Sequence, residues 1–196
     1  MAIPDKLNSG KKHINIEGKK AHTISIARAN IVAIVIMIPV VVLFGVSYYL
    51  IWGDNVLHQL NFKSLGFYLL FIVAGIIIHE LLHGITWAFF AKKGFRSIHF
   101  GIKWEYLTPY CHCTDALKVW QYIVGGLMPL LIMGLIPAAW AMIKGNALLM
   151  FYGIFFSVTA GGDIQAIWLL RKIKSNQLIY DHPEELGFII EDEGNA

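Results

Sequence analysis

Five consecutive residues, His79-Glu80-Leu81-Leu82-His83, carry the side chains of this chain that are best suited to chemistry. Histidines four positions apart lie one above the other on one face of a helix, so their imidazoles can share one metal ion. A glutamate next to the first histidine lies beside that metal, where it can take a proton from an attacking water and pass it to a leaving amine. The spacing therefore predicts the zinc site of a hydrolase, with His79 and His83 as ligands and Glu80 as general base.

The same three polar residues also have a plainer interpretation, in which they join neighbouring helices by hydrogen bonds. They lie within an apolar run long enough to cross a bilayer. Ionisable side chains at mid-depth in a membrane cost about 2.5 kcal/mol or more and usually mark function, so we favour the metal site over a packing role. Imidazole and carboxylate ligands also accept other divalent ions, and the choice of zinc over these stays open.

A catalytic zinc ion normally has three protein ligands, so a third must come from elsewhere in the chain. Asp163 is the only other acidic residue within a predicted span. At about 1.5 Å per residue, the two histidines lie about 14–20 Å from Lys92 at their helix end, and Asp163 about 12 Å from Arg171. These depths are compatible, and we expect Asp163 to be the third ligand. The alternative is a buried aspartate that is hydrogen-bonded to a neighbouring helix.

The composition excludes most other classes of protein. The 196 residues are 57% hydrophobic and 15% charged, with a mean hydropathy of +0.59, whereas a soluble domain is roughly 45–50% apolar and about 25% charged. The net charge of +3, without basic residues alternating with aromatics, argues against nucleic acid as a partner. Cys111 and Cys113 are too close in sequence to form a disulfide framework. We therefore expect an integral membrane protein in contact with a lipid bilayer.

Four windows reach the length of about 20 apolar residues that a membrane helix needs. They cover residues 26–52, 66–91, 119–143 and 147–170, and together they define a transmembrane domain over residues 26–172. The connecting segment 92–118 mixes aromatic and β-branched residues around two glycines, which favours a short sheet. The predicted fold class is an all-α integral membrane protein with about four transmembrane helices and a small β insertion at the cytoplasmic face.

Lysine and arginine placement predicts the orientation in the membrane. Six of these residues precede or begin the first span, five lie in segment 92–118 and three follow the last span, against two in the other loops. Fourteen against two predicts that both termini and the central loop are cytoplasmic. In the N-terminal segment 1–25, alternation over 13–18 and 23–26 suggests a short hairpin. We expect the C-terminal segment 173–196, acidic from Asp181 onward, to be a solvated, mobile tail.

Two further patterns leave alternatives open. Gly125, Gly126 and Pro129 in the third span either let that span pack against the metal-bearing helix or make room for an extended substrate, and plain helix packing serves equally well. The triplet Cys111-His112-Cys113 is either a second metal site or a pair of ordinary reduced thiols at the cytoplasmic face, and we favour the thiols.

An HExxH sequence in a membrane helix, followed by a later membrane helix with an aspartate, resembles the site-2 class of intramembrane zinc metalloproteases. The strings His79-Glu80-Leu81-Leu82-His83-Gly84, Pro109-Tyr110-Cys111-His112-Cys113 and Gly161-Gly162-Asp163-Ile164 look more like a bacterial family of zincin-type membrane peptidases. This resemblance covers about residues 62–172. It implies zinc held by His79, His83 and Asp163, Glu80 as general base, and the bacterial cytoplasmic membrane as the location.

Two functions from different classes remain. The first is a zinc metalloprotease that hydrolyses peptide bonds of membrane proteins or peptides near the cytoplasmic side, with the segment around residues 106–113 capturing the substrate as an added strand. The second is a non-catalytic metal-binding or transport-type membrane protein, since intramembrane histidines and aspartates also line ion pathways. Transport offers no reason for a glutamate next to a ligand, so we favour the protease. The sequence carries no signal for oligomeric state.

Overall fold

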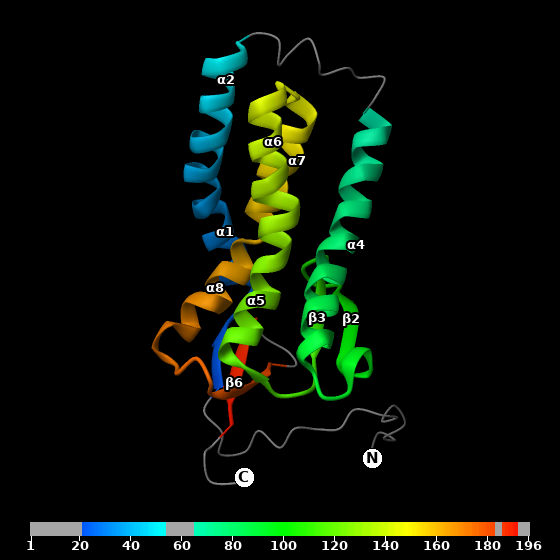
Figure 1. The fold of residues 1–196 in the computed structure, drawn as a ribbon, viewed down its shortest axis with the longest axis vertical. Coiled ribbons are helices and arrows are strands. Elements are labelled where there is room, and N and C mark those ends of the chain that lie inside the picture. The colour runs from blue at the N-terminus through cyan, green and yellow to red at the C-terminus, as the bar shows by residue number, and fades with distance from the viewer. Residues whose placement is uncertain (1–20, 54–64, 183–185, 192–196) are drawn as a thin grey trace, which may run out of the picture.

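The structure is a computed structural model that describes residues 21–53, 65–182 and 186–191. Within these residues, four helical segments are long and apolar enough to cross a membrane, namely Ala27–Trp52, Gly66–Phe90, Val119–Lys144 and Ala147–Lys172. Figure 1 shows that they stand roughly side by side, with the β-strands gathered at one end. The predicted number of membrane-length helical segments is therefore confirmed, whereas their insertion in a bilayer stays a prediction.

Three of the four segments change their helical form along their length. The first consists of α1 (Ile26–Val40), a π-helical turn (Val41–Val46) and α2 (Ser47–Trp52). The third consists of α5 (Val119–Pro129), a π-helical turn (Leu130–Leu135) and α6 (Ile136–Lys144). Both π-helical turns follow a proline directly or closely, and proline removes one backbone donor and clashes with the preceding turn. Only α4 (Leu65–Phe90) runs as one regular helix.

The fourth segment is interrupted where the sequence predicts one continuous span over 147–170. Helix α7 (Ala147–Thr159) ends at Ala160, whose ψ of 0° departs from helical geometry, and α8 (Gly161–Leu169) begins directly after it. In Figure 1, α8 leaves the direction of α7 and runs toward the β-strands. The side-chain amide of Gln165 donates to the carbonyl of Ala29 at 2.9 Å, which holds α8 against α1.

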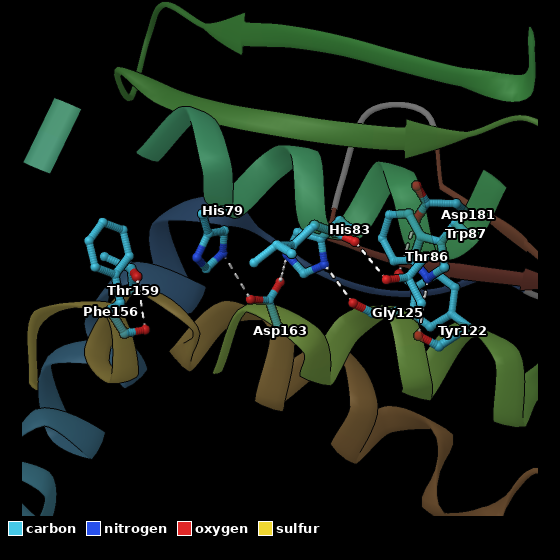
Figure 2. Close-up of polar contacts among 11 residues, drawn as sticks. His79, His83, Thr86, Trp87, Tyr122, Gly125, Phe156, Thr159, Asp163 and Asp181 are labelled. Atoms are coloured by element: carbon cyan, nitrogen blue, oxygen red, sulfur yellow. Dashed lines mark hydrogen bonds and ion pairs between the residues drawn. The ribbon is translucent and has the colours of Figure 1, made fainter. Parts of the chain in front are cut away.

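The segment between the second and third helices forms an antiparallel hairpin of β2 (Ile98–Lys103) and β3 (Thr108–Cys113). It lies along the C-terminal half of α4, with β3 next to the helix (Figure 2). Gly84 makes this approach possible, because a Cβ there would stand 2.5 Å from the ring of Phe100. The predicted sheet within residues 92–118 is thus confirmed.

A second sheet joins the two ends of the described chain. Its antiparallel strands are β1 (Ala21–Ile24), β6 (Leu186–Ile190), β5 (Leu178–Asp181) and β4 (Leu117–Lys118), in that spatial order. Ile179 and Phe188 have no exposed surface and share a core with Trp87 of α4 and Leu170 at the end of α8. This core attaches the sheet to the two helices that carry the candidate ligands.

The prediction of a mobile acidic tail from Asp181 onward is wrong for Asp181 and for residues 186–190. Asp181 ends β5, and the apolar run 186–190 pairs with strands on both of its sides. Five apolar residues among acidic neighbours are enough for a strand once a partner strand is available, which local charge counting does not reveal. Strand β1 forms as expected, but its described partner is β6. Residues 13–18 and 192–196 lie outside the described residues.

Replacing Phe188 by alanine tests whether β6 belongs to the core. Loss of this fully buried ring should lower the free energy of unfolding by about 3–5 kcal/mol, seen as a lower Tm of the detergent-solubilised protein. Phe89→Ala is the matched control, because that ring is 85% exposed and its loss should change stability by less than about 0.5 kcal/mol. Equal Tm values for the two variants would contradict the buried strand.

Candidate metal centre

Helix α4 presents two buried imidazoles to the interior of the helical bundle. His79 and His83 are 6% and 3% exposed, and their rings meet edge to face with centroids 5.0 Å apart. The four-residue spacing places both on one helical face, as the sequence predicts. The ring of Phe156 on α7 lies 6.2 Å from the ring of His79. It can come this close because Gly75, one turn earlier, has no Cβ to meet it.

The break at Ala160 brings Asp163 to these imidazoles. Asp163 lies in the first turn of α8, and its carboxylate points at both histidines (Figure 2). One carboxylate oxygen, Oδ2, is 3.4 Å from Nε2 of His79, and the other, Oδ1, is 3.3 Å from Nε2 of His83. The structure therefore brings together the three residues that the sequence suggests as ligands, from two helices that are about eighty positions apart.

The spacing of these donor atoms fits a tetrahedral metal ion. Zinc binds nitrogen and oxygen at about 2.0–2.2 Å, so two of its ligand atoms are separated by about 3.3 Å. The nitrogen to oxygen distances of 3.3 and 3.4 Å match that separation and exceed the roughly 2.7–2.9 Å of a charge-assisted hydrogen bond. Among the described residues, Oδ2 of Asp163 is buried without a hydrogen-bond partner. Two imidazoles and a carboxylate are ligands that zinc accepts, and the residues fit the ion.

The backbone of a glycine on α5 fixes the orientation of the His83 ring. The Nδ1 of His83 donates to the carbonyl oxygen of Gly125 at 2.9 Å, which leaves Nε2 free to face Asp163. A Cβ at Gly125 would stand 2.1 Å from the indole of Trp87, so only glycine lets α5 come this close to α4. For Gly125 the structure supports packing of the third span against α4, the helix with the two candidate histidine ligands, whereas Gly126 faces Ile167 of α8.

Stacked aromatic rings continue from His83 toward the sheet. The ring of His83 stacks on Trp87, with centroids 5.2 Å apart, and Trp87 stacks on Tyr122 at 5.1 Å. The indole of Trp87 also donates to the backbone carbonyl of Tyr122 at 3.2 Å. Figure 2 shows this row of rings ending near Asp181 of β5. The orientation of His83 thus depends on side chains that reach the β-layer, by which we mean the β2–β3 hairpin and the four-stranded sheet together.

Glu80 lies next to His79 on α4, and its carboxylate is within reach of the hairpin. Its carboxylate accepts a hydrogen bond from the backbone N–H of Cys111 on β3. Glu80, the three candidate ligands and Cys111 all line one cavity of about 500 Å³. Glu80 thus borders the same cavity as the candidate ligands without joining their cluster, and its role as general base stays a prediction.

The thiols of Cys111 and Cys113 show no sign of a second metal site. Burial, followed by the nearby carboxylates of Glu80 and Asp181, holds the pKa of Cys111 far above its usual range. Burial likewise raises the pKa of Cys113 to about 12. Both residues are free thiols, and in the described part of the chain the metal-capable cluster is that of His79, His83 and Asp163. The structure therefore favours the interpretation as ordinary reduced thiols.

Among the polar residues of the cavity wall to which the sequence assigned no catalytic role, three are joined by hydrogen bonds. They are His112, Tyr122 and Asp181. His112 was considered only as a metal ligand, but its Nδ1 contacts the carboxylate of Asp181 at 2.9 Å. A single aspartate at the end of a short strand carries no motif, so the sequence offers no signal for Asp181.

Comparison with known proteins gives one family. A family model described as "Putative zincin peptidase" matches residues 71–178, a little over half of the chain, including all of the candidate metal centre. Neither the curated proteins nor the solved structures contain a significant match. The expectation of a zincin-type peptidase family is confirmed at this level, and the relation to site-2 proteases stays a prediction.

Metal content tests the ligand set directly. Purified protein supplied with zinc and then freed of excess metal should retain about one ion per chain, measured by elemental mass spectrometry. His79→Ala, His83→Ala and Asp163→Ala should each lose it, because a structure with two remaining ligands binds zinc far more weakly. His99→Ala is the control, since this exposed histidine lies outside the cluster. Retention of zinc by Asp163→Ala would remove Asp163 from the ligand set.

Two neighbouring glycines provide a matched test of how the close packing of α5 on α4 orients His83. Gly125→Ala places a methyl group in the indole of Trp87, which should cost about 1–3 kcal/mol of stability and weaken zinc binding about 10- to 100-fold. Gly126→Ala brings its Cβ within 3.2 Å of only the flexible end of Ile167, so we expect changes below about 1 kcal/mol. Tm and zinc titration measure both, and similar behaviour of the two variants would contradict this account.

Proposed function

Because the chain belongs to this family of zincin peptidases, we propose that it is a zinc-dependent intramembrane endopeptidase. Its substrates would be membrane proteins or membrane-associated peptides, cut near the cytoplasmic side. The single observation that carries this proposal is the position of Glu80, which borders the same cavity as the candidate ligands but is held by the N–H of Cys111 rather than by them. A site that served only to hold an ion would not require this arrangement.

The chemistry divides between the ion and the protein. Zinc, when bound by His79, His83 and Asp163, supplies a Lewis acid that polarises the scissile carbonyl and makes water a stronger nucleophile at neutral pH. The carboxylate of Glu80 takes one proton from the attacking water, whose oxygen forms a bond to the carbonyl carbon. As the carbon–nitrogen bond breaks, Glu80 returns the proton to the leaving amine. The hydrogen bond from Cys111 holds the carboxylate in place for both transfers.

The surface of the helices supports a location within the bilayer. Large apolar side chains that are more than half exposed cover the outer faces of the first and second helical segments: Ile31, Val35, Ile38, Val42, Leu43, Leu50, Phe67, Phe71, Val73, Ile77, Ile85 and Phe89. Such a surface in water would favour association, whereas lipid satisfies it. Within the described residues, the basic side chains other than Lys144 belong to segments at or next to the end that carries the β-strands, so we propose that this end and both termini are cytoplasmic.

Strand β3 offers a way to hold a substrate in extended form. A helical substrate must unwind before its peptide bonds become accessible, and adding a strand to an exposed edge satisfies the freed backbone groups. The N–H of Cys111 faces Glu80, and the N–H and C=O of one residue share a side of an antiparallel strand. The carbonyl groups of Pro109 and Cys111 therefore also face away from β2, along the cavity, where a substrate backbone can donate to them.

Glu80→Gln tests catalysis separately from metal binding. The amide keeps the shape of the side chain and cannot take a proton, so cleavage should fall about 10²- to 10⁴-fold while zinc content stays near one per chain. The assay places the protein in vesicles with total membrane proteins of a bacterial expression host and identifies new N-termini by mass spectrometry.

Glu105→Gln is the control, because this exposed residue lies in the turn of the hairpin, where its side chain should not affect cleavage. If wild type and Glu80→Gln yield the same N-termini at the same rate, the proposed role of Glu80 is wrong. If the wild type retains zinc but produces no cleavage beyond that of Glu80→Gln, the alternative of a non-catalytic or transport-type metal protein is favoured.

A further inference from the structure

A second polar cluster lies in the same cavity as the candidate metal centre. Its centre is Asp181, which is 9% exposed and accepts three hydrogen bonds. Its Oδ2 contacts Nδ1 of His112 at 2.9 Å and the backbone N–H of Cys113 at 3.3 Å, and its Oδ1 accepts from the hydroxyl of Tyr122 at 3.0 Å. Residue 181 lies beyond the segment 71–178 that the family model covers.

The contacts of Asp181 fix the direction of the His112 ring. Because Nδ1 faces the carboxylate, Nε2 points away from it, and the ring lines the cavity with 13% of the side chain exposed. The imidazole is not needed to attach β5 to its neighbours. The N–H of Cys113 and the hydroxyl of Tyr122 already join Asp181 to β3 and α5. An oriented imidazole that borders a cavity is therefore available to a ligand.

Two separate sets of contacts connect this cluster to Glu80 and to the candidate ligands. The residue before His112 is Cys111, whose backbone N–H donates to Glu80. On the other side, Tyr122 stacks on Trp87, which stacks on His83. A peptide that lies along β3 next to Glu80 would therefore pass His112.

We propose that His112 is a second catalytic group, which donates a hydrogen bond from Nε2 to the carbonyl oxygen of the bound peptide, and that Asp181 is its positioning residue. This inference rests on the proposed peptidase function. Nδ1 of His112 donates to the carboxylate of Asp181, so Nε2 is a donor to the peptide when the imidazole carries a proton on each nitrogen. When water adds to the carbonyl carbon, negative charge grows on that oxygen and the hydrogen bond strengthens, so the transition state gains more than the bound substrate.

The proposal makes His112→Asn the informative variant. The amide nitrogen of asparagine can occupy the place of Nδ1 and keep the contact with Asp181, but nothing replaces Nε2. His99→Asn is the matched control, because His99 is the cross-strand partner of His112 in the same hairpin and is exposed. Asp181→Asn removes the negative charge that faces Nδ1 of His112 while preserving the size of the side chain.

Binding of two matched peptide pools separates transition-state from ground-state contacts. One pool contains phosphinic peptides, in which a tetrahedral PO₂⁻ group replaces the scissile amide, and the other contains the same peptides with the amide intact. All proteins carry Glu80→Gln, so that the amide peptides are not cut, and are loaded with zinc. We expect His112→Asn and Asp181→Asn each to weaken phosphinic-peptide binding about 100-fold. Binding of the amide peptides should change less than about 3-fold, with zinc content unchanged.

The double variant should lose no more affinity for the phosphinic peptides than either single variant, because Asp181 acts through His112. Unchanged phosphinic-peptide binding by His112→Asn would overturn the proposal, as would equal weakening of both pools or loss of zinc, each of which indicates a structural role. Failure of the zinc-loaded parent protein to bind phosphinic peptides would instead contradict the peptidase function itself, and the inference about His112 with it.

Discussion

The approach of one carboxylate, on a side chain that is 21% exposed, to two buried imidazoles is the constraint on which the rest of this structure depends. Asp163 lies among apolar helices, where an uncompensated charge is costly, and its oxygens face the two histidines of α4 at distances longer than ordinary hydrogen bonds. A divalent cation between these atoms would resolve the cost, because it would pair with the carboxylate and use the lone pairs of both imidazoles. The helices must then hold three side chains in a geometry that apolar packing alone would not select.

Two local features of the helices meet this requirement. The interruption at Ala160 turns α8 out of the direction of α7 and places Asp163 in its first turn, where the positive end of the helix dipole favours a carboxylate. Gly125 removes the Cβ that would collide with Trp87 and so lets its own carbonyl reach His83. Helix packing and the orientation of the candidate ligand are thus coupled, because the carbonyl that orients the imidazole belongs to the helix that packs against α4.

The β-layer contributes groups to the cavity of the candidate metal centre. Strand β3 supplies the backbone N–H that holds Glu80, and β5 supplies Asp181, which meets Tyr122 at the end of the aromatic row from His83. Hydrolysis within apolar helices requires polar groups that admit water and a substrate backbone without exposing every unsatisfied group to lipid. For the proposed hydrolysis, these polar groups would come from strands, whose edges present backbone donors and acceptors that a continuous helix uses internally.

The sequence by itself determined the four apolar helices, the hairpin segment and the pairing of His79 with His83, because these depend on local composition and on the helical period. It also singled out Asp163, since acidic residues are rare in such spans. Only the tertiary structure decided that the fourth helix breaks at Ala160, that residues 186–190 form a buried strand with residues 21–24, and that Asp181 reaches His112. These features arise from contacts between distant segments, and strand pairing leaves no periodic signal in five residues that are read alone.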